Sequence, residues 1–143
     1  MLKARQSLQS TLVPTDKNGV RSIFKYLKQG CLIIILPDHL PKESGGFYSN
    51  FLGQKTLSTT LVAKLANKTQ CNLIGLSCIR DELYGFNVHC SKFSEKILSD
   101  DLKTSVDYSN KDLENMINVA PEQYICSYKR FINCYGNINK YRS

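Results

Sequence analysis

The sequence predicts a single α/β domain over residues 1–143, with helices that flank a mostly parallel or mixed sheet. Two apolar runs, at 31–36 and 72–80, have the composition of buried strands, and a row of leucines at helical spacing lies between them at 56–68. A strand, a helix and a strand joined by a crossover of this length form a right-handed parallel βαβ unit. We therefore expect these three segments to build the centre of the sheet.

Residues 17–29, KNGVRSIFKYLKQ, have the spacing of an amphipathic helix that ends at Gly30. Its apolar stripe consists of Val20, Ile23, Phe24 and Leu27. Four basic residues recur on a separate face, namely Lys17, Arg21, Lys25 and Lys28. This basic face is either a solvated surface or a surface that meets anionic headgroups.

The run CLIIIL at 31–36 is rich in isoleucine and closed by a proline, which is typical of a strand buried on both faces of a parallel sheet. Asp38 and His39 follow its C-terminal end, the edge at which open α/β sheets bind ligands. The segment 40–53 is polar, contains glycines and aromatic residues, and is longer than a plain connection needs to be. We expect a functional loop there.

The segment 56–68, TLSTTLVAKLANK, predicts a helix that packs on the sheet. The run NLIGLSCIR at 72–80 is the next buried strand, and YGFNVHC at 84–90 alternates as its antiparallel partner across a DEL turn. Arg80 ends this strand at the same sheet edge as Asp38, where an ion pair with a loop acid is the simplest expectation.

The pattern from 100 to 118 is helical, with the inward positions Leu102, Val106, Leu113, Met116 and Ile117. Pro121 interrupts it. Because proline fits the first turn of a helix, PEQYICSYKRF at 121–131 should open a new helix, with Glu122 near its positive end.

Composition and charge exclude several classes of protein. The six cysteines have no C-x-x-C pair and no zinc-site spacing, so we expect free thiols in a reducing compartment, no metal and no cofactor. No run reaches the roughly 18 apolar residues of a membrane span, the N-terminus lacks the apolar segment of a signal peptide, and no nucleophile elbow or phosphate loop is present. The net charge of +7 favours an anionic partner.

Six segments follow one another along the chain: LKARQ, LKQG, ILPDH, GGFYSNFLGQKTLSTTLVAKLANKTQ, the strand ending in IR, and PEQYICSYKRF. In this order and at these separations they resemble the lipid A biosynthesis acyltransferases, the lauroyl- and myristoyl-type enzymes of Gram-negative bacteria. The resemblance covers essentially all 143 residues but only the C-terminal half of such an enzyme, and it implies a partial lysophospholipid-acyltransferase-like fold. APEQY followed by KRF is the most specific segment, although Cys126 stands where the family commonly has tryptophan.

The resemblance implies transfer of a fatty acyl group from acyl carrier protein to a hydroxyl of a lipid A precursor. It also implies a histidine base with an acidic residue five positions further on. Here Ser44 stands five positions after His39, and Ser94 stands five after His89. Since the family carries this motif and a membrane anchor upstream of the matched part, we expect a truncated chain without catalytic residues. Such a chain is either complemented by a separate N-terminal half or inactive.

Several residues are nonetheless candidates for the site. Substrate binding is expected at Arg5, Asp38, His39 and Arg80, with His39 as a loop histidine rather than a new base. Contacts to lipid phosphates are expected at Lys129 and Arg130, with a packing role weighed equally. Structural roles are expected at Gly53, Pro121, Glu122 and Tyr124. Phe47 and Phe51 are more typical of core lids than of acyl-chain contacts.

We therefore expect a peripheral protein on the cytoplasmic face of the bacterial inner membrane, or a cytoplasmic fragment. Its partners are the acyl donor, the lipid A precursor and an anionic membrane surface. The alternative is a basic non-catalytic module that binds anionic lipid or nucleic acid. Nucleic acid is disfavoured because only Phe24 and Tyr26 accompany the basic face, and Phe24 belongs to the apolar stripe.

Overall fold

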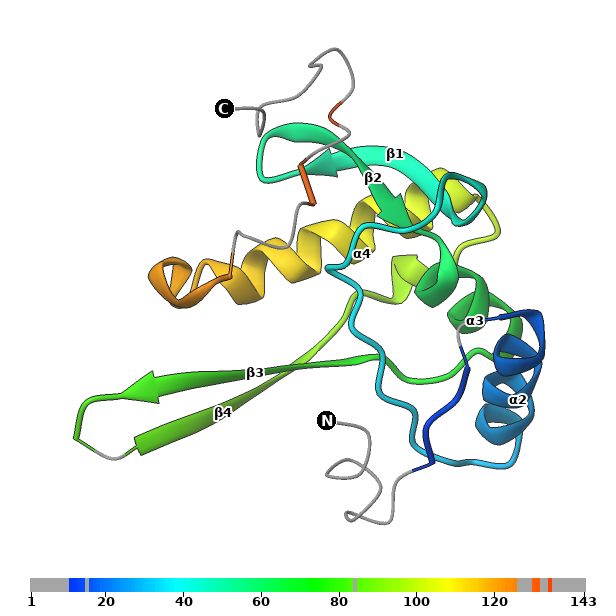
Figure 1. The fold of residues 1–143 in the computed structure, drawn as a ribbon, viewed down its shortest axis with the longest axis horizontal. Helices are drawn as coiled ribbons and strands as arrows, with labels where there is room; N and C mark the ends of the chain where they lie inside the picture. Colours follow the sequence, from blue (N-terminus) through cyan, green and yellow to red (C-terminus); the bar gives the residue numbers. More distant parts are fainter. Residues whose placement is uncertain (1–10, 15, 84, 126–129, 132–133, 135–143) are drawn as a thin grey trace. The chain divides into compact units, whose positions relative to one another are not determined.

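The structure is a computed structural model that describes residues 11–14, 16–83, 85–125, 130–131 and 134 (Figure 1). The chain divides into two compact units, Met1–Ile34 and Ile35–Ser143. Among the described residues, helix α2 lies in the first unit, and all strands lie in the second. No helix within these residues combines the length and the apolar character that a membrane span requires.

Helix α2, Lys17–Lys28, confirms the first predicted helix. The side chain of Asp16 caps its start by accepting a hydrogen bond from the backbone N–H of Gly19 at 2.8 Å. The helix ends at Lys28, and Gly30 follows with a φ of 79°, in the left-handed region that glycine adopts without strain. The four basic side chains predicted to share a face are all exposed.

The segment 31–36 does not form the predicted buried strand. It is irregular in structure, and its side chains Leu32, Ile34 and Leu36 are 87%, 76% and 56% exposed. A strand that is buried on both faces needs hydrogen-bonded neighbours on its edges. Within the described residues this segment pairs with no strand, so its apolar composition alone does not make it one.

The predicted loop at 40–53 is instead largely a β-hairpin. Strands β1, Gly46–Phe51, and β2, Gln54–Thr59, pair antiparallel. Leu52 and Gly53 connect them with φ values of 48° and 73°, the arrangement of a tight two-residue hairpin turn. The β-branched residues at the start of the predicted helix 56–68 therefore lie in β2, and helix α3 begins only at Leu61.

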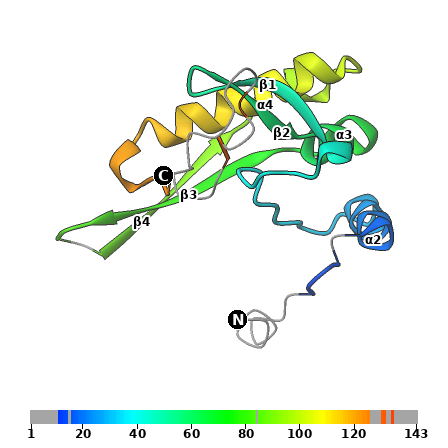
Figure 2. The ribbon, with the colours of Figure 1, turned by 45° about the horizontal axis from the view of Figure 1, so that its top comes forward.

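Helix α3, Leu61–Thr69, and helix α4, Leu102–Ile117, pack with the first hairpin around one core in the second unit (Figure 2). The buried apolar side chains are Phe51, Leu57, Val62, Ala63, Leu65, Ala66, Ile97, Val106 and Cys134. Helix α4 confirms the helix predicted between 100 and 118. Of its predicted inward residues, Val106 is fully buried and the other four are half-buried.

Strands β3, Ile74–Asp81, and β4, Gly85–Lys92, form the predicted antiparallel pair. They are not buried, since every residue of β4 is exposed. The presence of both helices and strands confirms the α/β class. Both sheets of the described residues are two-stranded and antiparallel, so the predictions of a mostly parallel sheet and of a βαβ unit are wrong. The βαβ prediction failed because its first strand, at 31–36, does not form.

Candidate functional site

Arg130 is the buried charge of a polar cluster in the described part of the second unit. Its side chain is only 1% exposed. The Nη1 atom donates to the carbonyl oxygen of Pro37 at 2.8 Å. The Nη2 atom donates to Asn110 Oδ1 at 2.9 Å and to Ser58 Oγ at 3.2 Å. The guanidinium carbon lies 4.1 Å from the ring centroid of Phe51, a cation–π contact that covers one face of the charge.

Burial lowers the pKa of the Arg130 guanidinium below its ordinary value, because removal from water disfavours the charged form. The nearby Tyr124 and the negative charge of Asp38 both act in the opposite direction. An arginine remains protonated under any ordinary condition, so the cluster holds a permanent positive charge inside the fold.

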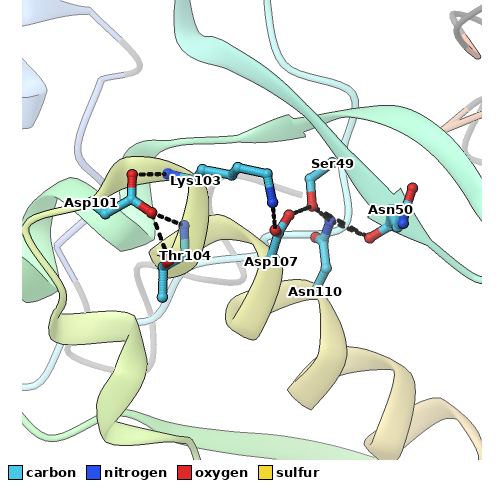
Figure 3. A network of polar contacts seen from close by, with 7 residues as sticks. All are labelled: Ser49, Asn50, Asp101, Lys103, Thr104, Asp107 and Asn110. Atoms are coloured by element: carbon cyan, nitrogen blue, oxygen red, sulfur yellow. Dashed lines mark hydrogen bonds and ion pairs between the residues drawn. The ribbon is translucent and has the colours of Figure 1, made fainter.

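Asn110 extends this cluster from helix α4 into the first hairpin (Figure 3). Its Nδ2 donates to the carbonyl oxygen of Asn50 at 2.9 Å, to Ser58 Oγ at 2.8 Å and to Ser49 Oγ at 3.0 Å. Ser49 in turn donates to Asp107 Oδ1 at 2.6 Å. The amide is therefore hydrogen-bonded on both sides inside the core.

The outer end of the same network reaches the solvent on helix α4 (Figure 3). Lys103 Nζ lies 2.7 Å from the second carboxylate oxygen of Asp107, an i, i+4 ion pair. This pair raises the pKa of the Lys103 ammonium, mainly through its hydrogen bond to Asp107. The polar chain thus runs from an exposed ion pair to the buried guanidinium of Arg130.

The interior members of this network were not predicted from the sequence. Ser49, Ser58 and Asn110 are at most 3% exposed. A weak signal existed in β1, where Phe47, Ser49 and Phe51 alternate with more exposed residues and so share the inward face. Nothing local marks Ser58 or Asn110, because their burial depends on contacts to residues more than fifty positions away along the chain.

Asp38 and His39, the candidates after the first apolar run, lie in a turn directly after Pro37. Asp38 is half-buried and His39 is exposed. Because Pro37 accepts a hydrogen bond from Arg130, the structure brings this turn and Arg130 together. The second histidine, His89, is exposed on β4, in the other hairpin.

The contacts of Arg130 direct its guanidinium at protein acceptors, and give no support to the expected contact with lipid phosphates. Its proposed partner in that contact, Lys129, lies outside the described residues, as does Arg5. Of the two roles weighed for Arg130, the observed geometry favours packing.

Arg80 is exposed, and its guanidinium carbon lies 5.5 Å from the ring centroid of Phe86 across the β3–β4 pair. Its backbone is held by the PEQY segment, since Gln123 Oε1 accepts from the Arg80 N–H at 2.8 Å and Gln123 Nε2 donates to the Arg80 carbonyl at 3.0 Å. The side-chain amide of Gln123 therefore satisfies β3 as a neighbouring strand would.

The residues for which structural roles were predicted lie in a hairpin turn and in or directly after a short 3₁₀ helix. Gly53 occupies the left-handed position of the β1–β2 turn. Pro121 opens a short 3₁₀ helix, Pro121–Gln123, in place of the predicted longer helix, and residues 126–129 of that prediction lie outside the described part. Glu122 is exposed and Tyr124 is half-buried.

The two phenylalanines of the first hairpin differ in environment. Phe51 is fully buried and stacks on Phe131, with ring centroids 6.0 Å apart, as expected for a core lid. Phe47 is half-buried and contributes to a shallow open depression beside the hairpin, between the charged side chains of Glu43 and Lys55.

Comparisons with known proteins agree with the resemblance. The model of the family described as bacterial lipid A biosynthesis acyltransferase matches residues 1–133. The chain is 24% identical over 132 residues to the lipid A biosynthesis palmitoleoyltransferase of Escherichia coli K12, and equally to a lipid A biosynthesis acyltransferase of Shigella flexneri. Each match covers 91% of this chain but 43% of the relative, so the chain spans less than half the length of both. Because the family model matches nearly all of it, the chain belongs to the bacterial lipid A biosynthesis acyltransferase family.

Proposed function

We propose that this chain is the acceptor-site scaffold of a lipid A acyltransferase-like protein. When complete, that protein transfers a fatty acyl group from acyl carrier protein to a hydroxyl of a lipid A precursor. The observation that carries the proposal is the meeting of the two most specific family segments, the PDH turn and the KRF segment, through the hydrogen bond from Arg130 to Pro37. This hydrogen bond supports a scaffold role, because it holds the turn that carries Asp38 and His39 against Arg130.

The chemistry of acyl transfer indicates which group this chain does not supply. An acceptor hydroxyl must lose its proton as it attacks the thioester carbonyl, and an imidazole held by a carboxylate is suited to take that proton. Neither His39 nor His89 is followed by an acid five positions later. We therefore infer that residues 1–143 do not supply the base, and that this segment by itself transfers no acyl group.

The role proposed for Asp38 is to bind a sugar hydroxyl or another polar group of the acceptor. Arg130 holds the backbone of the preceding residue at 2.8 Å, which restricts where the Asp38 carboxylate points. A fixed carboxylate binds a hydroxyl with less loss of conformational entropy than a mobile one. Arg130 thus contributes to acceptor binding through the position of the turn.

The test is equilibrium binding of a labelled lipid A precursor in detergent micelles, together with a transfer assay using acyl carrier protein loaded with a fatty acid. We expect binding without transfer, and binding about tenfold weaker for Asp38→Asn. Asp100→Asn removes the same charge from an exposed acid elsewhere in the second unit and should leave binding unchanged. Wild-type chain that fails to bind the precursor overturns the scaffold proposal, and transfer that disappears in His39→Ala overturns the absence of a base.

A second function, attachment to anionic lipid, is favoured by helix α2. Its basic side chains are exposed, and its apolar stripe is half-buried or exposed, with Val20 at 39%. Lys28 Nζ lies 4.8 Å from the ring centroid of Phe24, so one cation lies directly beside the stripe. This arrangement suits a helix lying in the headgroup region. We propose that it places the protein peripherally on the cytoplasmic face of the inner membrane.

Liposome flotation over a salt series tests this attachment. Vesicles containing phosphatidylglycerol should retain the chain at low salt, and vesicles of phosphatidylcholine alone should not. The double variant Arg21→Glu/Lys25→Glu should lose retention. The variant Lys64→Glu/Lys68→Glu makes the same charge change at the same spacing on α3 and should keep it. Stronger retention by nucleic acid than by these vesicles would favour the alternative of a nucleic-acid module.

A further inference from the structure

One face of the β3–β4 hairpin is apolar and exposed. The cross-strand pairs Leu76↔Cys90 and Cys78↔Val88 lie next to each other on it. Its members, here called the apolar hairpin face, are Ile74, Leu76, Cys78, Phe86, Val88 and Cys90. Ile74, Leu76, Phe86 and Val88 are between 59% and 65% exposed, and both cysteines are exposed free thiols.

The opposite face of the same hairpin is covered near the start of β3. Gly75 is buried there, and a side chain at this position would collide with Met116 of α4 and with Phe93. Because successive residues of a strand point to opposite sides, contact of Gly75 with α4 turns Ile74 and Leu76 away from it. In Figure 1 the tip of the hairpin lies far from α3, on the side of the C-terminal end of α4.

Such a face is costly to leave in water. Four large apolar side chains and two thiols form one continuous patch, and contiguous apolar patches mark interaction sites. Cysteine thiols are among the side chains most often buried in proteins. A two-stranded sheet also has an unpaired edge on each strand and is marginally stable by itself. The hairpin therefore has the character of a sheet segment that lacks its covering layer.

Charged residues near the apolar hairpin face disfavour two of its possible partners, an anionic membrane and a second copy of the chain. Asp81 and Glu82 stand at the tip of the hairpin, which disfavours insertion into an anionic membrane. Arg80 and Lys92 lie on the apolar side at its two ends, so two stacked copies would bring like charges together. A different polypeptide segment with an apolar surface would cover the face without either of these repulsions.

We propose that the apolar hairpin face docks the part of a lipid A acyltransferase that lies outside the segment matched by residues 1–143. The relatives are more than twice as long as the matched segment, which covers 43% of them. The exposed run 31–36 is a second apolar segment that pairs with no strand among the described residues, as expected if sheet neighbours are supplied from elsewhere. This inference rests on the proposed scaffold role but not on acyl transfer or on Asp38.

The first test is co-expression of the full chain with a tagged polypeptide comprising the unmatched portion of the Escherichia coli palmitoleoyltransferase. The wild-type chain should co-purify with it in the absence of lipid. Leu76→Lys/Val88→Lys should reduce recovery about tenfold or more. Asn87→Lys/Ser91→Lys adds the same charge on the other face of β4 and should leave recovery unchanged. Since all four positions are exposed, thermal unfolding of both variants should match the wild type.

The second test is the rate of maleimide labelling at individual cysteines, measured by peptide mass spectrometry. Cys78 and Cys90 should react readily in the chain alone and about tenfold more slowly in the complex. A cysteine introduced by Ser91→Cys on the opposite face should react equally in both.

Three results would overturn the proposal: no co-purification of the wild type, retention of the lysine variant, or unchanged reactivity of Cys78 and Cys90 in the complex. Protection of both thiols in the isolated chain, with a sedimentation coefficient that rises with concentration, would show that a second copy covers the face instead. Because none of these measurements involves lipid or acyl transfer, a loss of precursor binding by the scaffold would be recognised separately.

Discussion

Asn110 Oδ1 accepts a hydrogen bond from Arg130 Nη2 at 2.9 Å, between two side chains that are 3% and 1% exposed. The other end of the same amide donates to the carbonyl oxygen of Asn50 and to the hydroxyl of Ser58. A side chain at this position must therefore accept on one side and donate on the other. Among residues of this size only asparagine does both.

Asn110→Asp should destabilise the fold even though it places a carboxylate beside the buried guanidinium. The new carboxylate oxygen would face the Asn50 carbonyl at the position of the lost donor, so two acceptors would meet in the core. We expect a loss on the order of 2 kcal/mol in the free energy of unfolding, measured by urea denaturation. Asn115→Asp, on the exposed side of α4, should change it by less than about 0.5 kcal/mol. A stabilised Asn110→Asp variant would show that the ion pair dominates.

The β1–β2 turn should respond to changes in backbone preference. Gly53 has a φ of 73° and Leu52 a φ of 48°, so leucine occupies a conformation that side chains with a Cβ adopt at a cost. Gly53→Ala should cost about 1 to 2 kcal/mol, and Leu52→Asn should be neutral or stabilising by up to about 1 kcal/mol. Gly45→Ala, where a Cβ meets open space, is the control in the thermal unfolding series. Equal effects at Gly45 and Gly53 would contradict the turn geometry.

Close approach of β3 to α4 should make Gly75 sensitive to any added side chain. A Cβ there would collide with Met116 and Phe93, so Gly75→Ala should cost about 1 to 3 kcal/mol. Met116→Ala should relieve part of this cost, which a double-mutant cycle measures as coupling. Ser91→Ala, at the exposed register partner of Gly75, should have little effect. Strict additivity of the Gly75 and Met116 changes would refute the contact.

The elements predicted correctly are those whose pattern is local. Helices α2 and α4 and the β3–β4 pair follow from periodicity, capping residues and a short turn, all within about twenty residues. Asp16 and Gly30 illustrate this, since they flank the start and the end of helix α2 and bond to the nearby Gly19 and Leu27.

The wrong predictions depended on partners that the sequence does not specify. The run 31–36 has a strand composition, but a strand forms only where another strand pairs with it. Leu57 fits a helical row with Leu61, yet the left-handed turn at Gly53 places it in β2. The burial of Arg130 is likewise not specified locally, because it arises from residues of three distant segments, Pro37, Ser58 and Asn110, and its contact with lipid phosphates stays a prediction.

Gln123 should protect the backbone amide of Arg80 from hydrogen exchange. Arg80 and Phe86 face each other in the ladder, and both the N–H and the carbonyl of Arg80 bond to the Gln123 side chain instead. In Gln123→Ala the Arg80 amide should exchange about fivefold faster, corresponding to the loss of about 1 kcal/mol. Glu122→Ala, at the exposed neighbour, should leave its exchange unchanged. Unchanged protection in Gln123→Ala would mean that other groups shield this edge.

Asp101 should make the stability of the fold depend on pH in the acid range. Its carboxylate caps α4 by accepting from the hydroxyl of Thr104 at 2.6 Å and from the Thr104 N–H at 3.0 Å. These hydrogen bonds lower the pKa of Asp101 below its ordinary value of 3.8. Because the folded state favours the ionised form, the stabilisation is complete above pH 3.8 and is lost as the pH falls through the lowered pKa.

Asp101→Asn keeps an N-cap acceptor but has no carboxylate to titrate. We expect its urea midpoint to lie below that of the wild type at neutral pH, and the difference to shrink as the pH falls from about 5 towards about 2. Thr104→Val removes the hydroxyl that contributes most to the shift, so it should weaken the same pH dependence while Asp101 is retained. A difference between wild type and Asp101→Asn that stays constant over this range would show that the carboxylate titrates alike in the folded and unfolded chains.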